Sequence, residues 1–524
     1  MYKLFFNGHI HTLDEDMPFV TALLVHGDRY AYCGDDNEIN LPQHLVHRID
    51  LRGGHVYPGF TDCHTHIATV ALNKERIRLD QCQTMMQALQ KIQDHIQHFP
   101  AGSWILGGGW NANLWPDGKP DKLVLDQITT AHPIVLYNKD GHTQWMNSKA
   151  LNLCHFNDET ADPPGGRLGR DARNKLNGLV FEKACDIVNS YAEKTGLEQL
   201  RRCMEMLYPD LYALGITSVH SCESLEIWSG FQNLLFENAL KIRICMHPPI
   251  ENADKFINAR LCSGYGNEWL RIGGFKYFVD GSLGSQTAEM FDNFELLDHA
   301  GIEVLTESTL SDQLQYAVEN RFSATVHAIG DKANHKTLNA IERVSNLTLR
   351  YGLRHRIEHA QIIRDYDLGR FVQLNVTASM QPLHIADDVR IADKYLGKRS
   401  KFAYRIGSLL RSGARIVFGS DMPIADPDPL KGIRAALTRR YLLDLNEPKW
   451  HEYECIEIPA ALRAYTSEAA YVSYEEQIKG TIEVGKLADF VVLSDDLEKA
   501  NELTLSDIVV KMTVLGGETV YRSE

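Results

Sequence analysis

Two histidines stand one residue apart in the stretch FTDCHTHI, where His64 and His66 follow the apolar run HVYPGF. In a β-strand, side chains two positions apart point to the same side, so both imidazoles would face one point. Imidazole nitrogens are good ligands for divalent metal ions, but a pair of them leaves a metal at least two ligands short. The alternative is that the two histidines belong to a loop and bind nothing. A metal site therefore requires partners from elsewhere in the chain.

Polar residues also end several other apolar runs. They are Lys276 in GFKYFVDG, His327 in ATVHAIGD, His359 in HRIEHAQ and Asp421 in IVFGSDMP. If these runs are parallel strands of one barrel, their carboxyl ends meet at one face and the side chains converge there. Taken singly, each residue has an ordinary explanation: a satisfied core histidine, a lysine reaching solvent or an aspartate that caps a helix. The ordered set favours a shared site, because each buried polar group would otherwise need its own partner.

The segments that position these residues have the pattern of an α/β protein. Apolar strand-like runs alternate with helical stretches, and eight of the strands fit a (β/α)8 TIM barrel over residues 56–479. The alternation of strands and helices is interrupted at about residues 73–195, where a loop-rich segment predicts an inserted subdomain that caps the site. Short strand-turn-strand patterns occupy residues 1–55 and 480–524. Neither end can bury a good core alone, so we expect both ends to form one small β-sandwich domain.

The ordered motifs resemble those of the amidohydrolase superfamily of metal-dependent hydrolases over nearly the whole chain. PGFTDCHTH is similar to the family's first strand, VHAIGD and IEHAQ to its fifth and sixth strand ends, and FGSDMP to the eighth. GTIEVGKLADFVVL resembles the C-terminal segment that returns to the β-sandwich. Further stretches, among them GFKYFVDGSLGSQTA and KDGHTQWMNSKAL, resemble the branch that includes N-substituted formamide deformylases.

The resemblance implies a binuclear metal centre. His64 and His66 would bind the first ion, and His327 and His359 would bind the second. Lys276, carbamylated by CO2, would bridge the two ions, because an N-carboxylated lysine supplies an anionic pair of oxygens where an ammonium group would be repelled. Nitrogen and oxygen ligands favour two zinc ions, with manganese, iron or cobalt as alternatives.

In that centre Asp421 would bind the first ion and would also move protons. A hydroxide bridging the ions would attack a carbonyl carbon, because the cations lower the pKa of bound water. Asp421 would accept the hydroxide proton and pass it to the leaving nitrogen, first as a general base and then as an acid. The predicted enzyme is an amidohydrolase that cleaves a carbon–nitrogen bond, other than a peptide bond, in a small molecule of the amide or formamide type.

Four residues are candidates for substrate binding: Trp110, His142, Gln381 and His384. The first two fall in the predicted insertion, where an aromatic ring could hold an apolar N-substituent and an imidazole could bond the substrate oxygen. Gln381 and His384 follow the seventh predicted strand and would lie at the catalytic rim. The alternative is a structural role, with Trp110 and Trp115 packing the insertion onto the barrel.

Three other functions stay open from the sequence. A metal-activated hydroxide would also attack lactones or phosphotriesters. A mononuclear deaminase is less well supported, since such enzymes of this superfamily place a glutamate soon after a site histidine, whereas His327 is followed by Ala328, Ile329, Gly330 and Asp331. A non-catalytic regulator or scaffold that keeps the barrel usually loses ligands, and here none of the six expected positions is missing.

The amino-acid composition limits the classes of partner molecule that we expect for the chain. The 524 residues carry 54 basic and 69 acidic side chains, and the formal charge of -15 argues against nucleic acid or an anionic membrane surface as the main partner. No apolar run approaches the roughly 20 residues that span a membrane, and the N-terminal apolar stretch is too short for a secretory signal, so we expect a cytoplasmic protein. Large barrel hydrolases often form dimers, but the sequence does not determine whether this chain is a homodimer.

Overall fold

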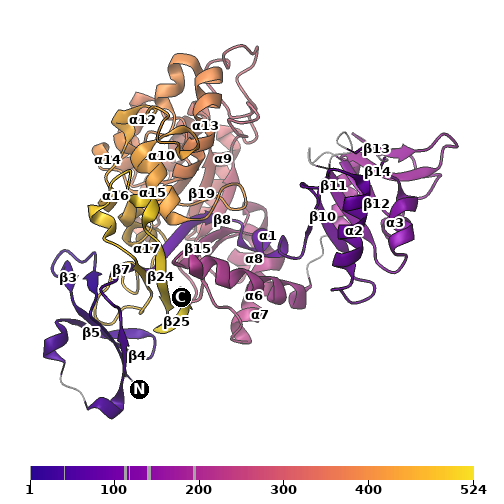
Figure 1. Cartoon of the computed structure of the whole chain (residues 1–524). Coiled ribbons are helices and arrows are strands. Elements are labelled where there is room, and N and C mark those ends of the chain that lie inside the picture. The colour runs from indigo at the N-terminus through magenta and orange to yellow at the C-terminus, as the bar shows by residue number, and fades with distance from the viewer. Residues whose placement is uncertain are drawn as a thin grey trace. The chain divides into compact units, whose positions relative to one another are not determined.

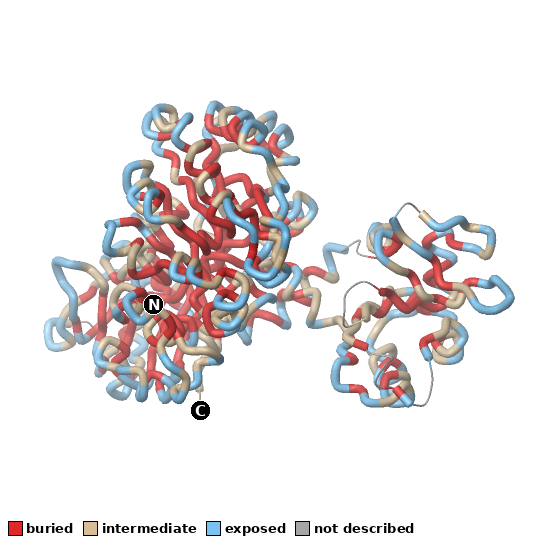
Figure 2. Tube along the Cα trace, turned by 90° about the horizontal axis from the view of Figure 1, so that it is seen from above, coloured by how far each residue is buried: buried red, intermediate tan, exposed pale blue. Residues whose placement is uncertain are grey.

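The computed structural model describes residues 2–39, 42–110, 115–116, 119–138, 143–163, 165–192 and 196–523. They form two compact units (Figure 1): Met1–Ala68 together with Leu207–Glu524, and Thr69–Met206. Each unit has its own buried core (Figure 2), to which both strands and helices contribute. Among the described residues, no helix has both the length and the apolar composition needed to cross a bilayer. Helices and strands are mixed along the chain, so the predicted α/β class is confirmed.

Two sheets of parallel strands in the first unit carry the histidines singled out above. One sheet has the strand order β17-β16-β15-β8 and the other the order β18-β19-β20-β21-β22. Every pairing within these two sheets is parallel. The strands of the first sheet are β8 (Phe60–Thr65), β15 (Ile216–Cys222), β16 (Arg243–His247) and β17 (Leu270–Ile272). Those of the second are β18 (Gly274–Phe278), β19 (Ser323–Ala328), β20 (Arg356–His359), β21 (Thr377–Met380) and β22 (Ile416–Phe418).

The ladders of these two sheets do not join into the one closed ring that the predicted barrel requires. Within the described residues, isolated bridges connect their edges, pairing Pro249 with Lys276 and Thr65 with Met422. At the first edge, β16 is followed by Pro248 and Pro249, whose ring nitrogens cannot donate a hydrogen bond. Lys276 N donates to Pro248 O at 2.8 Å, and the ladder goes no further. The structure therefore has the parallel α/β arrangement without a continuous barrel ladder.

Helices connect the parallel strands, and some of them begin at a side-chain cap. Ser224 Oγ accepts a hydrogen bond from Ile227 N at the start of α7 (Leu225–Phe236), between β15 and β16. Strands β8, β15 and β16 are buried along their whole length, as expected when both faces of a sheet are covered. The later helices are α8 (Ala253–Asn258), α9 (Glu307–Glu319), α10 (Asp331–Arg343), α11 (Ser345–Tyr351), α12 (Asp365–Gln373), α13 (Pro382–Leu396), α14 (Ile406–Ser412), α15 (Pro429–Thr438), α16 (Ile458–Ala464) and α17 (Ser467–Val472).

Strands from both chain ends share a second layer of the first unit. A six-stranded sheet has the order β25-β24-β23-β7-β2-β3, so strands near the N-terminus lie beside strands near the C-terminus (Figure 1). A four-stranded sheet, β5-β4-β1-β6, shares a core with it that includes Phe5, Val56 and Phe490. The strands are β1 (Tyr2–Phe6), β2 (His9–His11), β3 (Phe19–Val20), β4 (Ala22–His26), β5 (Arg29–Gly34), β6 (Val46–Asp50), β7 (His55–Pro58), β23 (Phe490–Leu493), β24 (Val510–Leu515) and β25 (Glu518–Arg522).

The second unit is a six-stranded sheet, β13-β14-β12-β11-β10-β9, with its own helices and core. Its boundaries with the first unit fall inside α1 (Ile67–Leu72) and α6 (Leu197–Ala213). The strands are β9 (Ile77–Arg78), β10 (Ile105–Trp110), β11 (Ile134–Asn138), β12 (Thr143–Met146), β13 (Gly166–Arg170) and β14 (Leu176–Glu182). The helices are α2 (Met85–Ile96), α3 (Lys122–Ile128), α4 (Ser148–Leu153) and α5 (Ala184–Ala192).

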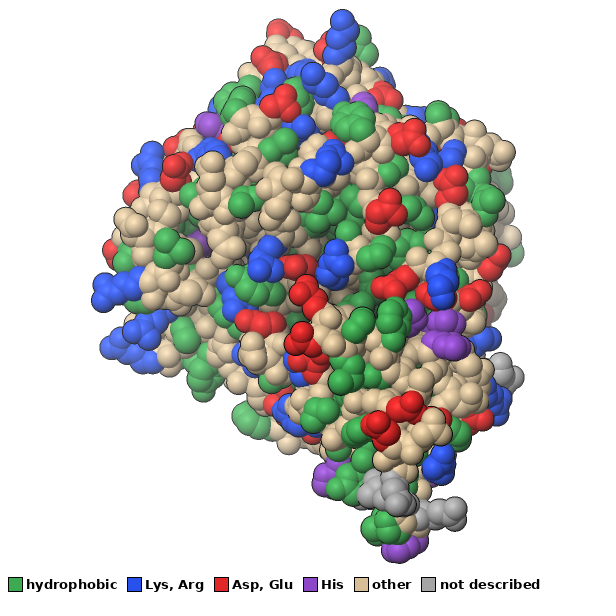
Figure 3. Space-filling model, turned by 90° about the vertical axis from the view of Figure 1, so that its left-hand side faces the viewer, with side chains coloured by type: hydrophobic (Ala, Val, Ile, Leu, Met, Phe, Trp, Pro, Cys, Tyr) green, Lys and Arg blue, Asp and Glu red, His purple; other side chains and the backbone are tan. Residues whose placement is uncertain are grey.

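Charged side chains are spread over the surface without separation by sign on the face drawn in Figure 3. There, acidic side chains are interspersed with lysines and arginines, and apolar side chains lie between them.

Candidate metal centre

A cavity of about 450 Å³ in the first unit gathers all six predicted metal ligands. Apart from Lys276, which is the middle residue of β18, each ligand comes from near the carboxyl end of a strand or the turn after it, because parallel strands present their carboxyl ends to the same side. The ligands are His64 and His66 at the end of β8, Lys276 in β18, His327 in β19, His359 at the end of β20 and Asp421 after β22.

Two of these histidines converge on a single carboxylate oxygen. Oδ1 of Asp421 lies 3.4 Å from His64 Nε2 and 3.5 Å from His66 Nε2. Ligand atoms about 2.0–2.2 Å from a tetrahedral ion lie roughly 3.3 Å from one another, so this spacing suits a shared cation. A second group of ligand atoms, from His359, His384 and Asp421, also lies within 4.8 Å of one another.

The neighbours of His64 and His66 determine which nitrogen of each ring carries the proton. The other nitrogen then faces the cavity with its lone pair. His64 Nδ1 lies 2.6 Å from Glu358 Oε2, and His66 Nδ1 donates to Cys222 O at 3.1 Å. A carboxylate and a carbonyl only accept hydrogen bonds, so both Nδ1 atoms carry the proton. In the neutral rings, both Nε2 lone pairs then point at a carboxylate oxygen of Asp421. Lone pairs facing a carboxylate are satisfied by a cation between them, either a proton or a metal ion, and the carboxylate–histidine pairing on the outer nitrogen is typical of metal ligands.

The other two histidines are fixed in the same way. His359 Nδ1 donates to Gln381 Oε1 at 2.8 Å, and the Gln381 amide nitrogen donates to Ser379 O at 3.3 Å, which sets the orientation of the amide. His327 Nε2 donates to Gly281 O at 3.0 Å. Each neutral ring therefore keeps one unprotonated nitrogen for another partner. The donor set fits a divalent metal ion.

The charges around the cavity also favour a bound cation. Burial alone would raise the pKa of the Glu358 carboxyl, but Arg356 and His64 hold that pKa well below its usual value. Burial, together with Lys276, lowers the pKa of His327 to about 4. Burial and the adjacent His327 also lower the pKa of His359 well below its usual value, so both rings are neutral at working pH. Neutral imidazoles beside an ionised carboxylate are the protonation states that a metal requires.

Lys276 is the one cationic side chain among the predicted ligands, and it is only 3% exposed. Its Nζ lies 4.9 Å from the centre of the Phe278 ring. Within the described part of the chain, Nζ has no carboxylate at ion-pair distance. A buried ammonium group without a direct ion-pair partner is costly.

The turn that carries Asp421 is held against β8 by a buried carboxylate. Asp62 accepts hydrogen bonds from Ser420 N at 2.9 Å and from Ser420 Oγ at 2.5 Å. Asp421 N in turn donates to His64 O at 2.7 Å. The backbone at Asp421 has a φ of 60°, a left-handed conformation that these contacts must maintain.

The same turn approaches β8 so closely that only glycine fits at position 419. A Cβ at Gly419 would lie 2.4 Å from His64 N. We expect Gly419→Ala to displace the turn and to lower the free energy of unfolding by about 1–3 kcal/mol. Thermal denaturation with metal-binding titration measures both effects. Gly369→Ala in α12 is the matched control, because a Cβ there meets nothing closer than the end of the Gln373 side chain at 3.9 Å. Equal melting temperatures for both variants would contradict this account.

Gln381 has a positioning role that its hydrogen bonds define. In Gln381→Ala, His359 Nδ1 loses its acceptor, and the ring can rotate or change tautomer. We expect metal affinity to fall about 10–100-fold, with turnover at saturating metal largely restored. Titration of the metal-free variant with zinc measures the affinity. Gln381→Glu keeps an acceptor for Nδ1 and is the matched control; a variant pair that binds zinc equally well would exclude this role.

The four predicted substrate residues occupy different settings. His384, from α13, lines the cavity, and Gln381 orients His359 instead of lining it. Trp110 is 2% exposed in the core of the second unit, where its Nε1 donates to Leu136 O at 2.8 Å and its ring lies against Trp115. Trp110 therefore packs inside the second unit itself. His142 lies outside the described residues.

Sequence reasoning missed the residues that orient the ligands. Glu358 and Arg356 lie two positions apart in β20 and form a buried ion pair that also contacts His64. Asp62 lies two positions before His64 in β8. The signal that could have found them is the presence of charged residues at every second position of a buried strand, because charges are rarely buried unless they are paired.

Comparisons with known proteins show which family the chain resembles. The sequence profile of the amidohydrolase family matches residues 48–521. The chain is 32% identical to the protein LONG AFTER FAR-RED 3 of Arabidopsis thaliana, over 98% of this chain and 91% of that protein. It is 25% identical to an N-substituted formamide deformylase of Arthrobacter pascens, over 98% of this chain and 97% of that one. Among solved structures, an uncharacterized metal-dependent hydrolase from Pyrococcus furiosus has a TM-score of 0.80 and 28% identity, covering 95% of this chain and 100% of that chain.

Proposed function

Because the chain belongs to the amidohydrolase family, we propose that it is a hydrolase that cleaves a carbon–nitrogen bond, other than a peptide bond, in a small amide or formamide. The observation that carries the proposal is the convergence of His64 and His66 on one oxygen of Asp421, with the outer nitrogen of each ring held by an acceptor. A divalent cation bound there would polarise a substrate carbonyl and make a hydroxide nucleophile available near neutral pH.

Two cations, most simply zinc, suit the nitrogen and oxygen donors. The first would be held by His64, His66 and Asp421, and the second by His327 and His359. The burial of Lys276 without an ion-pair partner among the described residues supports its carbamylation. The ammonium group would first lose one proton, and the resulting neutral amine would add to the carbon of CO2 and release a second proton. A buried cation would thereby become a carbamate anion whose oxygens suit divalent cations.

Asp421 and His384 are the groups placed to act on the substrate. Asp421 accepts a proton from the attacking water and passes it to the leaving nitrogen. Burial alone would raise the pKa of Asp421, but His64 and His66 lower it below its usual value, so the carboxylate is ionised. His384 Nε2 is buried and has no hydrogen-bond partner among the described residues, which suits it to donate to the substrate oxygen.

The rim of the cavity indicates what the leaving amine carries. Phe278, Leu283 and Ile424 line the cavity, and Phe278 and Ile424 are exposed. Apolar side chains around a polar centre suit an apolar substituent on the nitrogen. The similarity to an N-substituted formamide deformylase supports the same substrate class.

The two parallel sheets are best interpreted as the two parts of a (β/α)8 barrel. The bridges at their edges place β16 beside β18 and β22 beside β8. This arrangement would explain why six ligands from five segments meet at one face.

The test is an amine-release screen with and without a metal chelator. The substrates are N-formyl, N-acetyl and N-acylamino-acid compounds, cyclic amides and carbamates, with apolar and polar amines compared within each class. We expect chelator-sensitive release that is fastest for apolar N-substituted formamides. Release of ammonia alone from an aminated ring would indicate a deaminase. Turnover of lactones or phosphotriesters with no amide turnover would replace the proposed bond specificity.

A further inference from the structure

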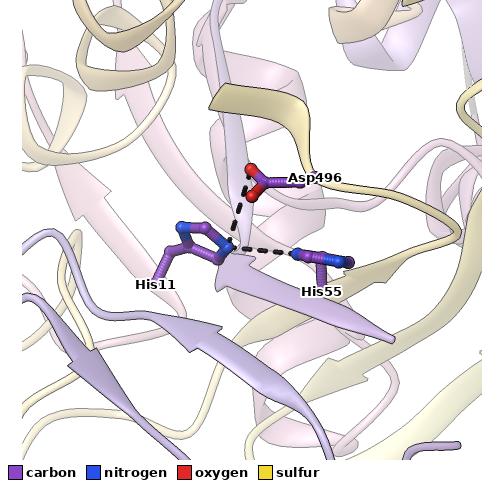
Figure 4. Close-up of side chains that lie close together, drawn as sticks. All are labelled: His11, His55 and Asp496. Atoms are coloured by element: carbon purple, nitrogen blue, oxygen red, sulfur yellow. Dashed lines mark hydrogen bonds and ion pairs between the residues drawn. The ribbon is translucent and has the colours of Figure 1, made fainter. Parts of the chain in front are cut away.

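A second group of metal-ligand side chains lies where the two chain ends meet. His11 is the last residue of β2, His55 is the first of β7, and Asp496 precedes the short helix η8 (Leu497–Lys499). Ligand atoms of the three lie within 4.8 Å of one another, and their side chains point toward a common centre (Figure 4). None of the three lines the cavity described above.

The His11 ring is held in a fixed orientation by its neighbours. It is 3% exposed, stacks on Tyr57 with ring centres 4.3 Å apart, and meets the edge of Phe19 at 5.0 Å. Nδ1 lies 3.2 Å from Glu498 Oε2, and because a carboxylate only accepts, the proton is on Nδ1. In the neutral ring, the lone pair of Nε2 then faces His55 Nδ1 at 3.2 Å and Asp496 Oδ1 at 3.9 Å.

Neighbouring groups also hold the Asp496 carboxylate in a fixed orientation. Oδ1 accepts hydrogen bonds from Tyr57 Oη at 3.2 Å and from Glu498 N at 3.1 Å, while Oδ2 lies 2.8 Å from Lys499 Nζ. Ligating carboxylates are held by such secondary contacts. The lysine neutralises one oxygen, and the other faces the two imidazoles.

We propose that His11 Nε2, His55 Nδ1 and Asp496 Oδ1 bind a divalent transition-metal ion, with zinc as the best fit to two nitrogens and one oxygen. The separations of 3.2 and 3.9 Å bracket the roughly 3.3 Å expected between ligands of a tetrahedral ion. Glu498 on the outer nitrogen of His11 repeats the arrangement of Glu358 on His64. The two clusters therefore use the same chemistry.

The open side of this site faces a cavity of about 520 Å³. His9, Asp495 and Lys499 are among its lining residues. Three protein ligands leave the fourth position of a tetrahedral ion to water or to a small anion that Lys499 could also contact. The ion would tie β2, β7 and the segment before η8 together, which joins the N-terminal and C-terminal parts of the chain.

A proton is the competing occupant of the same geometry. If His11 is an imidazolium between Glu498 and Asp496, the cluster is a hydrogen-bonded network that needs no metal. The two cases differ in metal content and in the response of stability to zinc, both of which are measured without any substrate.

The experiment is zinc titration of the chelator-treated full-length protein, with metal content determined after removal of free zinc. We expect the wild type to bind one more equivalent of zinc than His55→Gln and to gain several degrees more in melting temperature from zinc. His9→Gln is the matched control, since that ring stacks on His55 at 4.7 Å and lines the same cavity but lies outside the ligand set. It should bind as much zinc as the wild type.

A second variant, Asp496→Asn, keeps an oxygen for the Tyr57 hydrogen bond and guards against a fold defect in His55→Gln. It should lose the same equivalent of zinc, and both variants should retain turnover in any assay that the wild type passes. Equal zinc content in the wild type and both variants would establish the protonated network and overturn the proposal. That outcome would leave the proposed hydrolase activity unaffected.

Discussion

Asp421→Asn is expected to lower kcat by about 10²–10⁴-fold while the protein still folds. The amide has the size of the carboxylate, so the hydrogen bond from Asp421 N to His64 O stays, but an amide oxygen cannot take up a proton. The change also removes the negative charge that His64 and His66 share. Steady-state kinetics on the best substrate of the amine-release screen, with metal content determined on the same samples, measures the loss.

The matched control is Asp426→Asn, the same chemical change five residues along, on an exposed loop where Asp426 pairs with Lys431. It should keep wild-type turnover, since an exposed ion pair contributes little. If the chain is a scaffold with no catalytic role, neither variant changes a turnover rate. Asp421→Asn then differs from Asp426→Asn only in weaker metal binding. Undiminished turnover in Asp421→Asn would exclude Asp421 as the proton carrier.

Removal of CO2 is expected to prevent reconstitution of the metal centre through Lys276. Chelator-treated protein given zinc in CO2-free buffer should recover at least about 10-fold less activity than protein given zinc with bicarbonate, because an unmodified ammonium group repels cations. The readouts are the rate of reactivation and the zinc bound per chain as functions of bicarbonate concentration.

Lys276→Ala is the control for that experiment, because a chain without the amine has nothing for CO2 to modify. Its low activity should not respond to bicarbonate, whereas acetate or formate could supply the missing carboxylate and restore part of the metal binding. Reactivation of the wild type that is independent of bicarbonate would mean that Lys276 acts as an unmodified amine.

The ligands could be predicted because they end apolar runs, where sequence order and strand ends coincide. His64, His66 and Asp421 needed only the period of a strand and the rule that parallel strands share a carboxyl edge. The sequence CMHPPI also contains a signal against a closed ladder, because Pro248 and Pro249 cannot donate the hydrogen bonds that continue one. The prediction of a closed barrel ladder does not take that signal into account.

The contacts that tune the ligands could not be predicted, because they join strands that are distant in sequence. Glu358 could pair with any buried cation, and its choice of Arg356 and His64 depends on which side chains meet inside the sheets. The left-handed backbone of His359, with a φ of 71°, could not be predicted either, because the sequence has no glycine at that position to indicate it. Tertiary contacts impose both features.

The pairing of β7 with β23 sets an order of events during synthesis. β7 ends at Pro58 and its partner begins at Phe490, more than 400 residues later. At about 5–20 residues per second, the ribosome takes roughly 20–90 s to make that interval. For this time the edge of β7 that β23 will cover has no native partner, although β2, on its other side, is already made. The parallel sheets that hold His64 and His66 can therefore assemble before the layer from the two chain ends is complete.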